Sequence, residues 1–258
     1  MGAERSGHRV LPRVRRRLLS LAAKVTGVAF GPVVGSVTSV ITRVPAVALT
    51  FDGGPDPHWT PRLLAALQRH QAHATFFMIG KYAARHPEIV REAAGRGHAI
   101  ANHSWDHPSF PLISHSERRR QIRACAEALA PYEQRLFRPP YGHQDLSSRL
   151  DAMLLGYTVV TWSLHAFDWE PQSAQSMLAS LEDGIAPGSV VLLHDAVCDR
   201  RNLSRANTLA VVEALLTRYA DRYRFVTMPE LMRLGRARKR NWFKKADIAY
   251  LNSYERVT

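Results

Sequence analysis

Residues 46–55 read AVALTFDGGP, a short apolar run that ends in an acidic residue and a turn sequence. The apolar run Ala46–Phe51 is typical of a buried strand. Gly53, Gly54 and Pro55 then end the strand, because glycine and proline favour turns. The stretch therefore predicts a buried strand that presents the Asp52 carboxylate at its carboxyl end.

The same pattern recurs along the chain, where short apolar runs alternate with amphipathic stretches. The predicted strands are Ala46–Phe51, Ala74–Ile79, His98–Ala101, Leu136–Arg138, Tyr157–Trp162, Ser189–Leu193 and Arg224–Thr227. The predicted helices are Pro61–His70, Pro87–Gly95, Ser114–Ala130, Asp145–Leu155, Ser173–Leu181, Asn207–Tyr219 and Pro229–Leu234. Strands that are each followed by a helix indicate an α/β protein, and they favour a closed or nearly closed (β/α) barrel over an open doubly wound sheet.

Size and cysteine content narrow the class of protein. The chain has 258 residues, of which 46% are hydrophobic and 22% are charged, so it can bury one sizeable core. Cys125 and Cys198 lie far apart with no CxxC or Cys/His cluster, which excludes a disulfide scaffold, a zinc finger and a Cys-ligated iron–sulfur site. The pattern divides the chain into a basic, partly apolar extension (1–35), one folded domain (36–232) and a basic tail (233–258).

The positive charge lies at the two ends of the chain. Of the net charge of +13, residues 1–44 carry +7 and residues 233–258 carry +6, which leaves the body between them formally neutral. A neutral body does not support a basic groove, so no nucleic-acid partner is expected. The basic ends suit a lipid headgroup surface or another anionic polymer, and they also suit solvated ends that aid solubility.

The amino-terminal residues match a targeting segment only in part. Arg13–Arg17 precede the apolar stretch Leu18–Thr42, which is the order of a signal anchor. Lys24, three glycines and a proline interrupt this stretch, so no continuous spanning helix is expected, and no small-residue cleavage site stands out. Residues 34–44 alternate instead like a strand that leads into the domain. We expect a cytoplasmic or membrane-associated protein without a cleavable signal peptide.

Charged and imidazole side chains gather at the predicted strand ends. In (β/α) barrels the site lies where the strands deliver their carboxyl ends. Five of the seven predicted ends carry Asp52, His103 with His107, Arg138, His165 with Asp168, and His194 with Asp195. The sequence therefore predicts one shared polar pocket at that end of the barrel.

These residue types suggest metal and proton chemistry. His103 and His107 are four residues apart, so on a helical turn both imidazoles can share a metal, although two loop histidines with ordinary hydrogen bonds would look the same. Asp52 could be a general base, a metal ligand or a plain turn residue. Arg138 could hold the Asp168 carboxylate, either to tune an acid–base group or as an ordinary salt bridge. His194 suits a proton donor near neutral pH, or a hydrogen-bonded core histidine.

Five segments resemble, in order and spacing, the motifs of the polysaccharide deacetylases, the family 4 carbohydrate esterases. They are TFDGGP (50–55), HSWDH (103–107), RPPYG (138–142), WSLHAFDW (162–169) and LLHD (192–195). The resemblance covers roughly residues 36–230. It implies a distorted (β/α)7 barrel that hydrolyses an acetyl group of an N-acetylated glycan, oligosaccharide or glycoconjugate with one divalent metal.

The resemblance also gives the matching residues roles. His103 and His107 would be metal ligands, and Asp52 would be the base that deprotonates the water on the metal. Arg138 and Asp168 would tune that base. The metal would be zinc, or else cobalt, nickel or iron.

Four further residues would act on the substrate side. His194 would protonate the departing amine or alcohol, and the Tyr141 backbone N–H would help hold the oxyanion. Leu193 would line the acetyl pocket. Trp169 could stack on a sugar face, although packing in the core is the commoner role of tryptophan.

The sequence departs from the family pattern at two positions. The first motif of the family usually has a second aspartate as the third metal ligand, where this chain has Gly53, and the family commonly has aspartate where this chain has His165. We hypothesise that His165 or Asp52 completes the ligand set. The alternative is a catalytically impaired carbohydrate-binding protein on the same fold.

Overall fold

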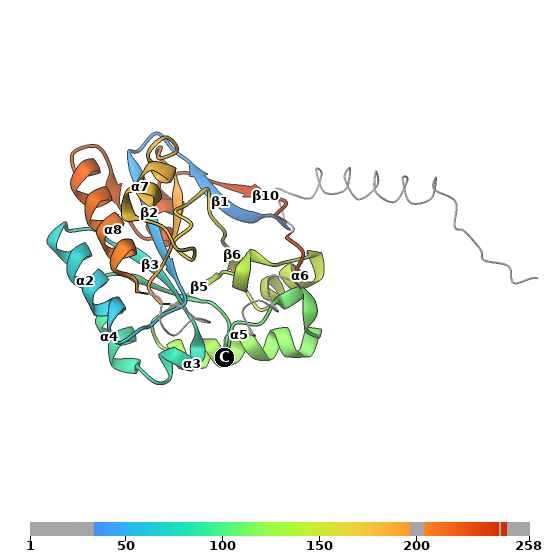
Figure 1. Cartoon of the computed structure of the whole chain (residues 1–258). Coiled ribbons are helices and arrows are strands. Elements are labelled where there is room, and N and C mark those ends of the chain that lie inside the picture. Colours follow the sequence, from blue (N-terminus) through green and yellow to red (C-terminus); the bar gives the residue numbers. More distant parts are fainter. Residues whose placement is uncertain (1–33, 197–203, 243, 247–258) are drawn as a thin grey trace, which may run out of the picture.

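A computed structural model describes residues 34–196, 204–242 and 244–246 of the chain (Figure 1). A curled parallel sheet follows the hydrogen-bonded order β6-β5-β4-β3-β2-β8-β7, and β9 pairs with the first residues of β2. Its strands are β2 (Ala46–Asp52), β3 (Ala74–Met78), β4 (Ala99–Asn102), β5 (Glu133–Phe137), β6 (Thr158–Val159), β7 (Leu164–His165), β8 (Val190–His194) and β9 (Arg224–Phe225). The predicted distorted (β/α)7 barrel is confirmed.

Helices cover the outside of this sheet, with one exception. They are α2 (Trp59–Arg69), α3 (Gly80–Ala83), α4 (Pro87–Gly95), α5 (His115–Leu129), α6 (Leu146–Leu154), α7 (Ala174–Glu182), α8 (Ala206–Tyr219) and α9 (Met228–Arg233). The exception is α9, whose buried Met228 and Leu231 pack inside the curl. Local capping explains several starts: the Ser114 side chain accepts the Glu117 N–H at α5, and Asp145 and Ser148 form a capping box at α6. All seven predicted helices are present, and the short α3 was not predicted.

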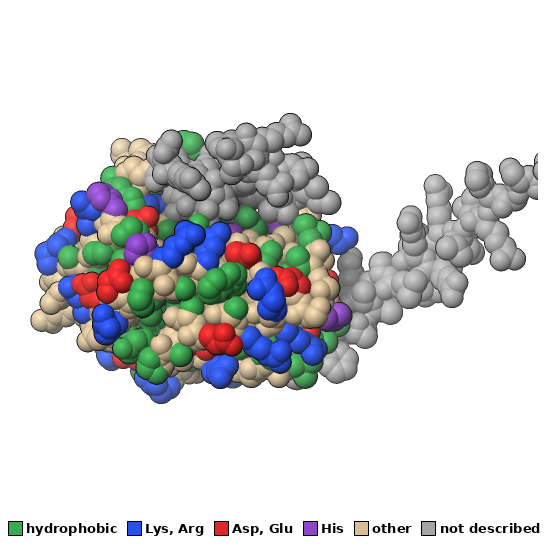
Figure 2. Space-filling view, turned by 90° about the horizontal axis from the view of Figure 1, so that it is seen from below, with side chains coloured by type: hydrophobic (Ala, Val, Ile, Leu, Met, Phe, Trp, Pro, Cys, Tyr) green, Lys and Arg blue, Asp and Glu red, His purple; other side chains and the backbone are tan. Residues whose placement is uncertain are grey.

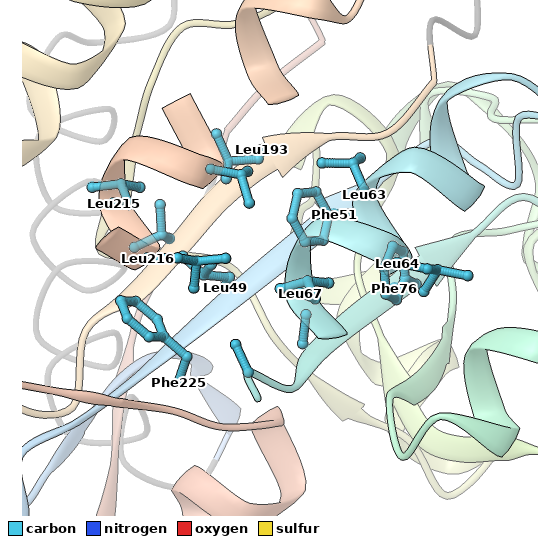
Figure 3. Packing of buried hydrophobic residues seen from close by; sticks show 14 of the residues in the cluster. Leu49, Phe51, Leu63, Leu64, Leu67, Phe76, Leu193, Leu215, Leu216 and Phe225 are labelled. Atoms are coloured by element: carbon cyan, nitrogen blue, oxygen red, sulfur yellow. The ribbon is translucent and has the colours of Figure 1, made fainter. Parts of the chain in front are cut away.

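The core follows from the alternation of side chains along the strands. In β2, Val47, Leu49 and Phe51 face the helices, where they pack in the cluster shown in Figure 3. Ala46 and Ala48 belong to a second cluster inside the curled sheet. A strand in a sheet that is covered on both faces has apolar residues at every position. This continuous apolar run is why 46–51 could be recognised as a strand.

The predicted strand Tyr157–Trp162 is wrong in its second half. Thr158–Val159 pairs with β5, and the Val160 N–H still donates to the Phe137 carbonyl. The chain then crosses to β8, where the Ser163 N–H donates to the Val190 carbonyl. A short strand, β7, follows and pairs with β8. An apolar sequence cannot distinguish one long strand from two short strands that pair with different neighbours.

A two-stranded antiparallel ribbon lies across this crossing. It pairs β1 (Ser36–Ile41) with β10 (Arg236–Arg240). The Val37 carbonyl accepts the Thr161 N–H after β6, and the Val40 N–H donates to the Gly188 carbonyl before β8, so β1 bridges the two. Residues Arg236–Arg240, expected in the basic tail, are therefore part of a strand. Exposed arginines that alternate with the half-buried Ala237 and Lys239 also suit an edge ribbon.

The surface mixes charges of both signs. Figure 2 shows basic, acidic and hydrophobic side chains interspersed over the visible part of one face, in keeping with the formal neutrality of residues 45–232. In the described part of the chain, no helix combines the length and hydropathy needed to cross a membrane.

Candidate active site

Strand register brings together Asp52, the expected base, and His194, the expected proton donor. Asp52 ends β2 and His194 ends β8, and the two residues are Cα partners in the parallel pairing of these strands. His103 follows the last residue of β4 and Arg138 follows the last residue of β5, where Asn102 pairs with Phe137. The carboxyl end of the sheet thus assembles these side chains at one level, as the sequence predicted.

Arg138 is fully buried and holds Asp52. Its Nη1 atom lies 2.7 Å from Asp52 Oδ1 and donates to Thr50 Oγ1 at 2.8 Å, while Nη2 donates to the Thr161 carbonyl. Burial lowers the pKa of Arg138, but the ion pair and hydrogen bond to Asp52 oppose that shift. The expected Arg138–Asp168 pair is wrong, because Arg138 crosses the inside of the sheet to β2.

Asp168 instead orients His194. Its Oδ1 lies 2.8 Å from His194 Nδ1, and its Oδ2 accepts the His194 backbone N–H at 2.7 Å and the Thr208 hydroxyl at 3.1 Å. Arg205 donates to the Asp168 carbonyl and lies 4.0 Å from its carboxylate. Burial alone would raise the pKa of Asp168, but His194 and Arg205 outweigh it and lower that pKa. A carboxylate that stays ionised fixes the imidazole with Nε2 directed away from it.

The buried His103 and the half-buried His107 form a pair with ring centroids 4.9 Å apart. His103 Nδ1 contacts the Arg138 carbonyl at 2.8 Å, and its Nε2 lies 3.7 Å from Asp52 Oδ2. Nδ1 of His107 is buried without a hydrogen-bond partner. Burial lowers the pKa of both histidines, so both are neutral. Neutral imidazoles, one oriented through its Nδ1 by a carbonyl, are suitable ligands for a divalent metal.

No third ligand joins this pair among the described residues. Across residues 34–196, 204–242 and 244–246, no group of three or more histidine, cysteine, aspartate or glutamate side chains could hold a metal ion. Gly53 has a φ of 102°, which would strain the aspartate usual in the family. The His165 ring packs against Phe167 and Trp169 at centroid distances of 4.1 and 5.4 Å. The residues thus fit a metal as two nitrogen ligands beside one carboxylate.

Loops at the site carry unusual backbone conformations. Ser104, His107, Tyr141 and Phe167 are non-glycine residues with φ between 53° and 67°. Such conformations cost energy and concentrate where a fold positions functional groups. Tyr141 sits in the turn after β5, and its ring centroid lies 4.4 Å from that of His107, so its backbone is held close to the histidine pair.

The expected role of Leu193 is wrong. Side chains alternate along β8, and Leu193 faces the helices, where it packs in the cluster of Figure 3. Leu192, two residues before His194, belongs to the cluster inside the curled sheet. Leu192 is therefore the β8 leucine on the same side as His194. The Trp169 ring lies 5.6 Å from that of His194, which places this tryptophan at the site.

Sequence reasoning assigned no role to Asp195, although it belongs to the fifth motif. This buried carboxylate accepts the Gly54 N–H at 2.9 Å and the Thr60 hydroxyl at 2.6 Å, and so fixes the turn after Asp52. A Cβ atom on Gly54 would lie 2.1 Å from Asp195 Oδ2, so only glycine fits there. Arg205 and Thr208 were missed as well, because no motif marks them.

Burial raises the pKa of Asp195 to about 6, despite its hydrogen bonds from Thr60 and Gly54. The folded state therefore binds a proton that the unfolded chain, with a pKa near 4, releases earlier as pH rises. We expect the free energy of unfolding to fall by up to about 3 kcal/mol between pH 4 and pH 7 from this group. Urea unfolding should show this slope in the wild type and a flatter one in Asp195→Asn. Parallel curves for the two proteins would contradict the assignment.

The arrangement is suited to hydrolysis. It places a carboxylate and a histidine, each held by a buried partner, on neighbouring strands, with a pair of neutral imidazoles beside the carboxylate. One group can accept a proton from water while the other donates one to a leaving group. The geometry is that of an acid–base pair on adjacent strand ends.

Known proteins carry the same sequence pattern and fold. Residues 39–160 match the family described as polysaccharide deacetylase. A peptidoglycan-N-acetylglucosamine deacetylase of Bacillus cereus is 36% identical over 197 residues, covering 75% of this chain and 70% of that protein. A chitooligosaccharide deacetylase of Sinorhizobium fredii is 33% identical over 191 residues, covering 70% and 88%.

A solved structure agrees with these relatives. The crystal structure of a peptidoglycan N-acetylglucosamine deacetylase superposes with a TM-score of 0.71 at 31% identity, covering 79% of this chain and 94% of that one. The relatives, the five motifs and the assembled strand ends lead to one conclusion. The chain belongs to the polysaccharide deacetylase family.

Proposed function

We propose that the protein hydrolyses the acetyl amide of N-acetylated sugar residues in a glycan, an oligosaccharide or a glycoconjugate. The observation that carries this proposal is the pairing of Asp52 with Arg138 and of His194 with Asp168 on adjacent strand ends. Relatives named as deacetylases of peptidoglycan N-acetylglucosamine and of chitooligosaccharides support the substrate class.

The proton steps belong to residues of this chain. Asp52, held at Oδ1 by Arg138, presents Oδ2 toward the His103 side of the site and accepts a proton from the attacking water. His194 donates a proton from Nε2 to the departing amine, since its Nδ1 is bonded to Asp168. The Tyr141 backbone N–H contributes to oxyanion binding, and Leu192 rather than Leu193 borders the acetyl group.

His103 and His107 would hold a divalent metal, with the Asp52 carboxylate beside them. Two imidazoles suit zinc best and also admit cobalt, nickel or iron. Such an ion would lower the pKa of water and polarise the amide carbonyl. The His165 ring packs against Phe167 and Trp169, which argues against His165 as the further ligand, and Asp52 keeps its role as the base.

Metal binding can be measured without activity. After chelator treatment and equilibrium dialysis against zinc, we expect about one bound ion per chain in the wild type. His103→Ala and His107→Ala should each weaken binding at least tenfold, because only two imidazoles form the pair. His86→Ala, which alters a half-exposed histidine outside the site, is the matched control. Equal zinc affinity in all four proteins would overturn the proposed ligands.

Acetate release distinguishes the enzyme from the alternative, a carbohydrate-binding protein that Gly53 has made inactive. Purified protein with N-acetylglucosamine oligomers should release acetate and leave free amines. Asp52→Asn should lower kcat by roughly 10²–10⁴. If the protein binds the oligomers but releases no acetate with any added metal, the result would favour the sugar-binding protein.

Association with a membrane surface is a separate part of the proposal. It rests on the basic residues of 1–44 and 233–258, which would be attracted to anionic lipid. Such attraction falls steeply with salt and is independent of the histidine pair.

A further inference from the structure

Helix α6 carries an apolar face that the fold leaves open. Leu146, Leu150 and Leu154 are 49%, 38% and 73% exposed. Spacings of four residues place all three on one side of the helix. The opposite side buries Ser148 and Ala152, so the leucines are not the core stripe of this helix. Figure 1 shows α6 at the periphery of the molecule, next to the ribbon of β1 and β10.

The amino-terminal segment joins the fold at this helix. Arg149 Nη1 donates to the Val34 carbonyl at 2.9 Å and also contacts Asn241, so the beginning of the described chain is tied to α6. The preceding sequence contains Arg13–Arg17. Its apolar residues are spaced by three and four, at Leu11, Val14, Leu18, Leu21, Val25 and Val28. This spacing, with arginines between, is the pattern of sequences that bind at membrane interfaces.

Basic side chains outnumber acidic ones on the elements that flank α6, and we call this excess of positive charge the cationic rim. Arg118 and Arg119 of α5 both bind the one buried carboxylate of Asp151. The carboxylate of Asp145 is occupied in capping α6. The exposed Lys244 follows the carboxyl end of the ribbon, and its backbone pairs with Gln144, two residues before α6.

We propose that the α6 face, defined as Leu146, Leu150 and Leu154, docks on an anionic lipid surface. Apolar side chains would enter the headgroup boundary while the cationic rim meets the lipid phosphates. The charge of the rim also argues against other binding partners of the α6 face. A second copy of the chain would bring two cationic rims together, and the segment with Arg13–Arg17 carries the same sign of charge.

This inference rests on the proposed membrane association and names the structured surface that makes contact. It also relates that surface to the site. The α6 helix follows the turn that contains Tyr141, whose carbonyl accepts a hydrogen bond from Lys244 at 3.1 Å. Docking through α6 would bring toward the lipid the turn of Tyr141, which ends four residues before this helix, and glycans attached at the membrane would then lie on that side.

Vesicle flotation of the full chain tests the proposal. The vesicles contain phosphatidylcholine and phosphatidylglycerol at 7:3, in low salt. The triple variant Leu146→Gln, Leu150→Gln, Leu154→Gln should partition at least tenfold more weakly than the wild type, because it loses the apolar contact and keeps the charge. The matched single variants are Leu154→Gln, expected to weaken binding about threefold, and Ile41→Gln, a comparably exposed apolar residue on β1 that should have no effect.

The controls separate the possible failures. Thermal unfolding of each variant checks that the fold persists. No flotation of the wild type would overturn both the membrane association and this surface. Flotation of the triple variant at wild-type strength would overturn the surface alone. A wild-type dimer that the triple variant abolishes, measured by light scattering, would overturn the lipid as occupant. None of these measurements uses acetate release, so they test the membrane surface independently of the proposed deacetylase activity.

Discussion

Arg138→Met should lower the free energy of unfolding by about 3–5 kcal/mol, the largest stability effect we expect from a single substitution at the site. The side chain is fully buried and holds Asp52 by a hydrogen-bonded ion pair. Its removal leaves a buried carboxylate uncompensated and the Thr161 carbonyl without this donor. Equilibrium unfolding in urea measures the effect.

Two further variants test whether the loss comes from the unpaired charge. Arg138→Met combined with Asp52→Leu should be less destabilised than the sum of the single changes, because no charge is left buried. Arg120→Met, which breaks an exposed pair with Glu117, should cost far less than Arg138→Met, because solvent screens that pair. A cost below 1 kcal/mol for Arg138→Met would contradict the structural role of the pair.

His194→Ala should lower kcat for deacetylation by roughly 10²–10⁴, because the departing amine loses its proton donor. Asp168→Asn should cause a loss of similar size. An amide in place of the carboxylate cannot accept both the His194 backbone N–H and its Nδ1–H in the same way, so the imidazole loses its orientation. Steady-state acetate release gives both values.

Coupling between the two substitutions distinguishes an oriented donor from two independent residues. In a His194→Ala background, Asp168→Asn should add less than about threefold, since Asp168 acts through His194. Thr208→Val, which removes one hydrogen bond to the same carboxylate, should cost less than either single change. Fully additive losses would show that Asp168 has another role.

The fold could be predicted because buried parallel strands leave a clear sequence pattern. Ala46–Asp52 and Val190–His194 are apolar on both faces and end in polar residues, so their strands and their delivered side chains could be recognised. The ribbon partner Arg236–Arg240 could not, because its pairing with β1 depends on residues almost 200 positions away and its composition resembles a solvated tail.

The members of the site were predictable, but their pairing was not. Position at a strand end identified Asp52, Arg138, Asp168 and His194. Which carboxylate meets which cation depends on side-chain direction across the curled sheet, and there Arg138 reaches Asp52. The error at Leu193 arose in the same way, because a shift of one residue along a strand moves a side chain to the other face.

The most direct measurement is acetate release from N-acetylglucosamine oligomers by chelator-treated protein, before and after zinc or cobalt is restored, beside His103→Ala. We predict no release without metal, release after its addition, and none from the variant under either condition. Acetate production that persists in His103→Ala, or that is absent from the wild type with every metal, would contradict a deacetylase centred on the histidine pair and the two proton carriers.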